Sequence, residues 1–154
     1  MAAGSVAAAV AFVDRPGVAV DVVETRTAHV LWRRVVAPGE HIELRYTHSV
    51  ERTPVIEEFR AERSGLRLVA MRFVSQGAGL PTEGYTREGG QFVLRTDRRV
   101  GVLPLRVSSI AGHRLRLGAE EADLVALAGD GAAIALTSGP GPLRVRWPRA
   151  SRSP

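Results

Sequence analysis

Hydrophobic positions recur along the chain mainly at a period of two, as in β-strands with one buried face. The predicted strands are residues 18–23, 29–36, 41–50, 55–62, 66–74, 91–95, 100–107, 113–117, 132–137 and 143–147. Residues 119–128 (AEEADLVALA) have the character of one short helix. The pattern predicts an all-β fold: a single antiparallel β-sandwich or partly closed barrel of about ten short strands, with at most one short helix.

Turn residues separate these segments and indicate a register for the first hairpin. Residues 37–40 (APGE) form a turn signal, and a four-residue loop there pairs residues 29–36 with the strand after it. Arg34 would then face Glu43 as an ion pair, and Arg45 would lie against Trp32 in a cation–π contact.

The second hairpin register brings two polar residues together on an apolar face. If residues 51–54 (ERTP) form a four-residue loop, His48 faces Glu57. The other expected partners are Val50 with Val55, Tyr46 with Phe59 and Leu44 with Ala61. One interpretation of the His48–Glu57 pair is structural, because a hydrogen-bonded pair tolerates burial and fixes register. The other is a site in which Glu57 orients the imidazole as a general base or metal ligand.

Composition narrows the class of protein and of site. The 154 residues predict one domain, with an all-β region over residues 17–147. Residues 1–16 are interpreted as a flexible segment or a degenerate signal or anchor, and residues 148–154 as a disordered tail. Cysteine is absent, which excludes disulfides, cysteine-zinc sites and thiol nucleophiles. The histidines lack His-x-His or His-Glu-x-x-His spacing, so neither a metal nor another cofactor is expected.

The basic residues raise the question of anionic partners. The formal charge is +5, and all 21 basic residues are arginine. One interpretation is codon usage in a GC-rich genome; the other is a surface for phosphate or anionic lipid. The arginines are scattered among 16 acidic residues and aromatic residues are only 5%, so no nucleic-acid platform is expected. Weak contact with an anionic membrane surface remains an expectation.

The remaining motifs mostly indicate turns and loops. Residues 77–81 (GAGLP) are too short for a dinucleotide fingerprint and predict a tight turn with a positive φ at glycine, or an amide nest for an anion. The serines lack a Gly-x-Ser-x-Gly elbow, which disfavours a serine hydrolase. His113 is interpreted as an edge or turn residue, and Asp130 with Gly131 as a hairpin turn.

The runs at residues 46–51 (YTHSVE), 53–55 (TPV), 77–81 (GAGLP) and 113–115 (HRL), with the glutamate at 57, resemble the family called domain of unknown function 1850. The resemblance extends from about residue 18 to residue 137. It implies a small bacterial protein encoded beside a TAXI-type TRAP transporter, a solute importer with a periplasmic binding protein. It implies no catalytic residues. The motif and candidate binding positions are His48, Ser49, Glu51, Pro54, Glu57, Gly77, Gly79, Pro81 and His113.

Two functional hypotheses follow. The first, resting on the resemblance, is a non-enzymatic accessory domain on the extracytoplasmic side of the membrane that contacts a TRAP permease or its solute-binding protein. Its expected surface comprises the 77–81 loop together with Arg33, Arg34, Arg45 and Arg52. The alternative is a ligand- or metal-binding protein, or a hydrolase, centred on His48, Glu57 and the 77–81 loop. A closed His48–Glu57 pair favours the first, and a cleft beside the glycine loop favours the second.

Overall fold

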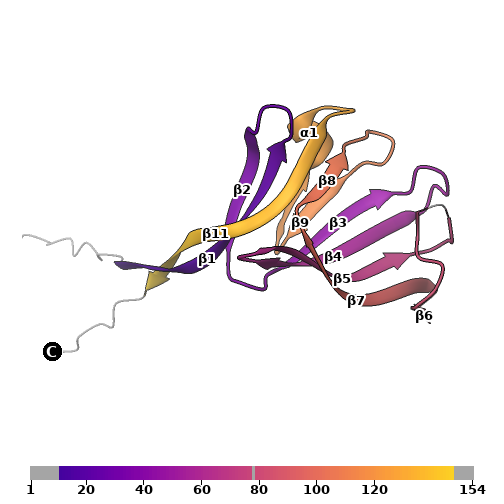
Figure 1. The fold of residues 1–154 in the computed structure, drawn as a ribbon, viewed down its shortest axis with the longest axis horizontal. Helices are drawn as coiled ribbons and strands as arrows, with labels where there is room; N and C mark the ends of the chain where they lie inside the picture. The colour runs from indigo at the N-terminus through magenta and orange to yellow at the C-terminus, as the bar shows by residue number, and fades with distance from the viewer. Residues whose placement is uncertain (1–10, 78, 148–154) are drawn as a thin grey trace, which may run out of the picture.

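The computed structural model describes residues 11–77 and 79–147, which form two antiparallel sheets (Figure 1). The smaller sheet has the order β2-β1-β11-β8. Its strands are β1 (Ala11–Glu24), β2 (Val30–Val36), β8 (Leu103–Arg106) and β11 (Ala133–Trp147). The larger sheet has the order β10-β9-β3-β4-β5-β7-β6. Its strands are β3 (His41–Thr47), β4 (Pro54–Glu62), β5 (Gly65–Phe73), β6 (Tyr85–Glu88), β7 (Gln91–Gly101), β9 (Arg114–Leu117) and β10 (Glu120–Asp123).

The two sheets share one core, which makes the domain a sandwich. Valines of β1 and two residues of β11 pack with inward residues of the larger sheet. The fully buried members include Val18, Val20, Val22, Ile42, Leu44, Phe59, Leu66, Leu115, Ile134 and Leu136. A second, smaller cluster comprises Val55, Phe73, Leu80 and Phe92, with Tyr85 packed against it. The all-β prediction is confirmed, in the form of two sheets rather than a closed barrel.

The longest pairing joins the two ends of the described chain. β1 pairs with β11 from Ala11 opposite Trp147 to Glu24 opposite Ile134. The two strands predicted at 132–137 and 143–147 are therefore one strand. Its interruption, residues 138–142 (SGPGP), stays within the strand because small residues allow close approach: a Cβ on Gly141 would lie 2.9 Å from the backbone nitrogen of Ala19.

The predicted first hairpin is wrong, because the turn at residues 37–40 carries the chain from one sheet to the other. β2 pairs with β1, whereas β3 pairs with β4 and β9. The turn is held to β4 by two backbone hydrogen bonds, from Gly39 N to the oxygen of Ala61 and from Ala61 N to the oxygen of Glu40. β2 and β3 thus lie in opposite sheets of the sandwich, and the apolar face of each is covered by the other sheet. The two strands of a hairpin would instead lie side by side in one sheet.

The side-chain contacts expected from that hairpin are also replaced. Arg34 pairs with Glu120 at 2.5 Å, and the guanidinium carbon of Arg34 lies 5.0 Å from the ring centre of Trp32. Arg45 instead pairs with Glu43, its neighbour two residues back on β3. Both residues of the predicted Arg34–Glu43 pair have therefore found other partners.

The second hairpin exists, but its register differs from the prediction. Leu44 lies opposite Glu57 and Tyr46 opposite Val55, so the loop has six residues, 48–53. The shift is even, which keeps the predicted apolar residues on the inward face. It removes His48 from the strand, however, and Val50 is 69% exposed. The predicted pairing of His48 with Glu57 is wrong.

The loop geometry explains this early end of β3. The N–H of Thr47 donates to the oxygen of Ala111. The N–H of His48 donates to the oxygen of Thr53, and Arg52 adopts a φ of 55°. A four-residue loop, by contrast, would have required pairing to continue to Val50.

The segment predicted as a helix is divided. Residues 120–123 form β10, paired with β9, and only α1 (Leu124–Ala128) is helical. Asp123 marks the boundary because its carboxylate accepts hydrogen bonds from the N–H groups of Val125 and Ala126. The predicted strand at 100–107 is interrupted at Val102, and β6 was not predicted. Residues 130–131 do form a turn, but it joins α1 to β11, so the predicted hairpin turn is wrong. Among the described residues, no helix has the length and apolarity needed to cross a membrane.

Candidate functional site

Three loops meet at one end of the larger sheet: residues 48–53, the segment after β5, and residues 107–113 (Figure 1). The hydroxyls of Thr53 and Ser75 lie 2.8 Å apart and join the first two loops. The bond from Thr47 N to Ala111 O, 2.8 Å long, joins the end of β3 to the third. Residues far apart in sequence therefore surround one place.

A cleft of about 350 Å³ opens at this meeting point. Four of the sequence-predicted positions line it: His48, Ser49, Gly79 and His113. Its other walls are Tyr46, Thr47, Leu80, Arg106, Ser108 and Ala111. The cleft thus contains both histidines of the predicted motifs and part of the glycine loop.

The remaining predicted positions support the loops rather than line the cleft. Glu51 packs on Gly77, where an added Cβ would lie 2.5 Å from the Cγ of Glu51. Pro54 begins β4 opposite Thr47. Pro81 is partly buried and follows Leu80, which is 7% exposed and belongs to the second cluster. The positive φ predicted for this turn occurs at Gly79, at 84°.

Glu57 pairs with Tyr46 instead of His48. The Tyr46 hydroxyl donates to Oε1 of Glu57 at 2.9 Å. Burial raises the pKa of Glu57 and outweighs both the Tyr46 hydrogen bond and the positive charge of Arg98. Burial, together with the Glu57 charge, also raises the pKa of Tyr46. The tyrosine is therefore a neutral donor whose ring orientation is set by the motif glutamate.

The ring of Tyr46 connects this pair to the cleft. Its centre lies 5.5 Å from that of the His113 ring, with the planes tilted by 33°. His113 stands immediately before β9, as expected, but it is only 6% exposed. Its Nδ1 accepts a hydrogen bond of 3.2 Å from the N–H of Ser108, and burial lowers its pKa. His113 is therefore neutral near pH 7, with its proton on Nε2.

His48 helps to shape the loop that carries it. Its Nδ1 accepts a hydrogen bond of 3.1 Å from the N–H of Glu51, and its oxygen accepts one from Arg52 N. Both cleft histidines thus use Nδ1 to accept backbone N–H groups. Each Nδ1 lone pair is therefore engaged by a backbone N–H and is not available to accept a proton from a serine hydroxyl.

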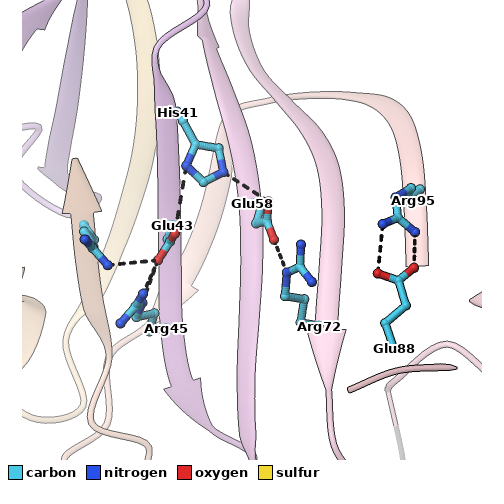
Figure 2. A network of polar contacts seen from close by, with 8 residues as sticks. His41, Glu43, Arg45, Glu58, Arg72, Glu88 and Arg95 are labelled. Carbon is cyan, nitrogen blue, oxygen red and sulfur yellow. Dashed lines mark hydrogen bonds and ion pairs between the residues drawn. The ribbon is translucent and has the colours of Figure 1, made fainter. Parts of the chain in front are cut away.

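The outer face of the larger sheet, which points away from the core, carries a network of ion pairs (Figure 2). His41 Nε2 lies 3.1 Å from Oε2 of Glu58, and Arg72 Nε lies 2.5 Å from Oε1 of the same glutamate. Burial acts to raise the pKa of Glu58, but the hydrogen bonds from Arg72 and His41 together outweigh it and lower that pKa. Glu43 joins Arg45, and the Glu88–Arg95 pair stands apart from the rest. These charges largely satisfy one another.

The arginine surface expected from the sequence is not continuous. Arg33 and Arg34 lie on β2 of the smaller sheet, and Arg45 lies on β3 of the larger sheet. Arg33 forms a bidentate pair with Asp21, with both bonds at 2.7 Å. Arg52, in the loop beside the cleft, is exposed. Of the expected surface, Gly79 and Leu80 line the cleft, and Arg52 lies in the loop beside it.

Sequence reasoning did not identify Arg106, Ser108 or Tyr46 as site residues. Tyr46 was assigned to the core by its alternation, and it does pack against the core while also lining the cleft. Arg106 and Ser108 carry no motif: Arg106 ends β8 and Ser108 lies in the 107–113 loop, and tertiary packing brings both to the cleft. Within the described ranges, no group of three or more histidine, aspartate or glutamate side chains is placed to hold a metal ion.

Comparison with known proteins gives one match. The family model described as "Domain of unknown function (DUF1850)" matches residues 42–124, more than half of the chain. Every motif position from His48 to His113 falls inside this segment. No curated protein and no solved structure matches the chain.

Proposed function

We propose that this chain, which belongs to the DUF1850 family, is a non-enzymatic accessory domain of a TAXI-type TRAP solute importer. In this proposal it acts on the extracytoplasmic side of a bacterial membrane and contacts the permease or the solute-binding protein. The observation that carries an interaction role is the convergence of motif residues from separate loops at one end of the larger sheet. Loops supported by a rigid sheet commonly carry binding functions.

The charge distribution supports contact through this end rather than through the sheet faces. The face charges of the larger sheet pair with one another, so less of their field is available to a partner. Arg52 is exposed in the 48–53 loop, beside the cleft. Exposed rim charges chiefly raise the rate of encounter, and salt screens them.

The test is capture of the importer from membranes of cells that express its genes together with this domain. We expect the permease or the solute-binding protein to co-purify, and the association to weaken as salt rises through ~0.15 M. Arg52→Ala should reduce capture. Arg63→Ala is the matched control, because Arg63 is an exposed loop arginine beyond the other end of β4. Deletion of the gene should also impair solute uptake. Normal uptake in the deletion strain, without capture of either protein, contradicts the proposal.

The cleft itself favours a second candidate function, the binding of a small ligand. Its volume of about 350 Å³ falls within the range of ligand pockets, and its walls combine apolar and polar groups. The test is a titration of the purified domain with small molecules, followed by nuclear magnetic resonance (NMR). Saturable shifts confined to cleft residues support this function, and their absence across all classes of ligand contradicts it.

A further inference from the structure

We propose that the cleft binds a small organic carboxylate with a short apolar body. This inference rests on the second candidate function, ligand binding at the cleft, and does not require association with an importer. It follows from the kinds of group that line the cleft and from the hydrogen bonds these groups already make.

The charged lining of the cleft is positive. None of the described residues that line it is an aspartate or glutamate, and Arg106 is among them. Nη1 of Arg106 donates to the oxygen of Gly131 at 2.7 Å. This bond engages one of the five N–H donors of the guanidinium. Among the described residues, Arg106 forms no ion pair, so an anion would not have to displace a carboxylate of the protein.

Two neutral donors of the cleft, Ser108 and His113, lie in the loop that follows Arg106. Ser108 Oγ accepts a hydrogen bond of 3.2 Å from Ile110 N, which leaves its own hydroxyl proton to donate. His113 uses Nδ1 as an acceptor from Ser108 N, so Nε2 carries the ring proton. A guanidinium, a hydroxyl and an imidazole N–H form a set that complements carboxylate oxygens.

Part of the remaining lining is apolar, beside the polar residues Thr47, His48 and Ser49. Leu80 and Ala111 are 7% and 8% exposed, and the ring of Tyr46 forms another wall. A volume of about 350 Å³ lies near the lower end of the range for ligand pockets. The apolar part of the lining suits a short hydrocarbon chain, and the volume limits the ligand to a small molecule.

The experiment uses the purified full chain and two probes of the same shape, hexanoate and hexanamide, in NMR titrations. We expect saturable binding of hexanoate, with shifts at residues 106–113, and at least tenfold weaker binding of hexanamide, because the amide lacks the charge. Equal binding of both probes, or binding of neither, overturns the proposal. Inorganic phosphate is titrated in parallel, and tighter binding of phosphate than of hexanoate overturns the carboxylate assignment.

Variants locate the site. Arg106→Gln should weaken hexanoate binding about tenfold. Arg99→Gln is the matched control and should bind like wild type, because Arg99 is also exposed and also donates to one backbone oxygen, that of Ser64 at 3.1 Å. If Arg106→Gln does not fold, Arg106→Lys and Ser108→Ala serve instead, and both should bind hexanoate more weakly than wild type. Wild-type affinity in the folded cleft variants overturns the proposal.

The outcomes separate this inference from the accessory function. Importer capture without hexanoate binding leaves the accessory role standing and rejects the carboxylate site. Hexanoate binding without importer capture supports the carboxylate site and rejects the accessory role.

Discussion

The hydroxyl of Tyr46 donates to the carboxylate of Glu57 across the β3–β4 pair, at 2.9 Å. This contact gives the motif glutamate a role that its position in the sequence does not reveal. Glu57 holds the hydroxyl at one end of the tyrosine, while the ring contacts His113 in the cleft. Glu57 is therefore a positioning residue, which acts on the cleft through Tyr46.

A double-mutant cycle tests this contact. Tyr46→Phe leaves the half-buried carboxylate without its donor, and Glu57→Leu leaves the hydroxyl without its acceptor. Each single variant should lose roughly 1–3 kcal/mol of unfolding free energy. The double variant should lose less than the sum, with a coupling of at least ~0.5 kcal/mol, because it removes both polar partners. Urea denaturation measures all four proteins. Additive losses would show that the hydrogen bond contributes nothing.

Neighbouring glutamates on opposite faces of β4 should respond oppositely to pH. The pKa of Glu57 is raised above 4.5, so the folded state binds more protons than the unfolded state in that range, and stability falls as pH rises through it. The pKa of Glu58 is lowered below 4.5, so its contribution is present above 4.5 and is lost as pH falls through the folded pKa.

Melting temperatures of Glu57→Gln and Glu58→Gln, measured against pH, distinguish these two signs. The stability of Glu57→Gln relative to wild type should rise as pH rises above 4.5. The stability of Glu58→Gln relative to wild type should instead fall as pH rises from the folded pKa of Glu58 to 4.5, and it should level off above that range. Parallel curves for the two variants would contradict the assignment of one carboxylate to the inward face and the other to the outer network.

The alternation of residues predicted strands well because strand period is a local property. β4 and β5 agree with the predicted segments to within a residue at each end, and the inward residues of β3 and β4 were assigned to the correct face. Register and sheet membership were not predictable in the same way. The turn after β2 has ordinary hairpin chemistry, yet it joins two sheets, because sheet membership depends on distant partners such as β11.

The candidate site was likewise predictable only in part. His48, Ser49, Gly79 and His113 were identified from the sequence, and they do share a cleft. The partner of Glu57 was missed because the observed β3–β4 register is shifted by four residues from the predicted one, which keeps the paired residues on the same face but exchanges their partners. Arg106 was missed because it ends β8 in the smaller sheet and joins the cleft only through tertiary packing, which hydrophobic periodicity does not describe.

The observed register makes a direct prediction about two apolar residues of the same hairpin. Leu44 is 2% exposed, so Leu44→Ala should lose roughly 2–5 kcal/mol of unfolding free energy. Val50 is 69% exposed, so Val50→Ala should change it by no more than about 0.5 kcal/mol. Urea denaturation of the two variants decides the matter. A large loss from Val50→Ala would indicate that β3 continues through the loop and pairs with Val55, as the four-residue turn requires.

Changing either glycine of the 77–81 loop to alanine should destabilise the protein, for a different physical reason at each position. A Cβ at Gly77 would lie 2.5 Å from Cγ and 2.8 Å from Oε1 of Glu51, whereas a Cβ at Gly79 would meet nothing within 4 Å but would be held at a φ of 84°. Both single variants should be destabilised, Gly79→Ala by roughly 1–2 kcal/mol of left-handed backbone strain. Adding Glu51→Ala should recover most of the loss from Gly77→Ala, because it removes the atoms that clash, and none of the loss from Gly79→Ala. Thermal melts of the five variants test this, with Glu51→Ala alone as the reference. Equal recovery in both backgrounds would mean that Glu51 destabilises the loop generally and does not pack on Gly77.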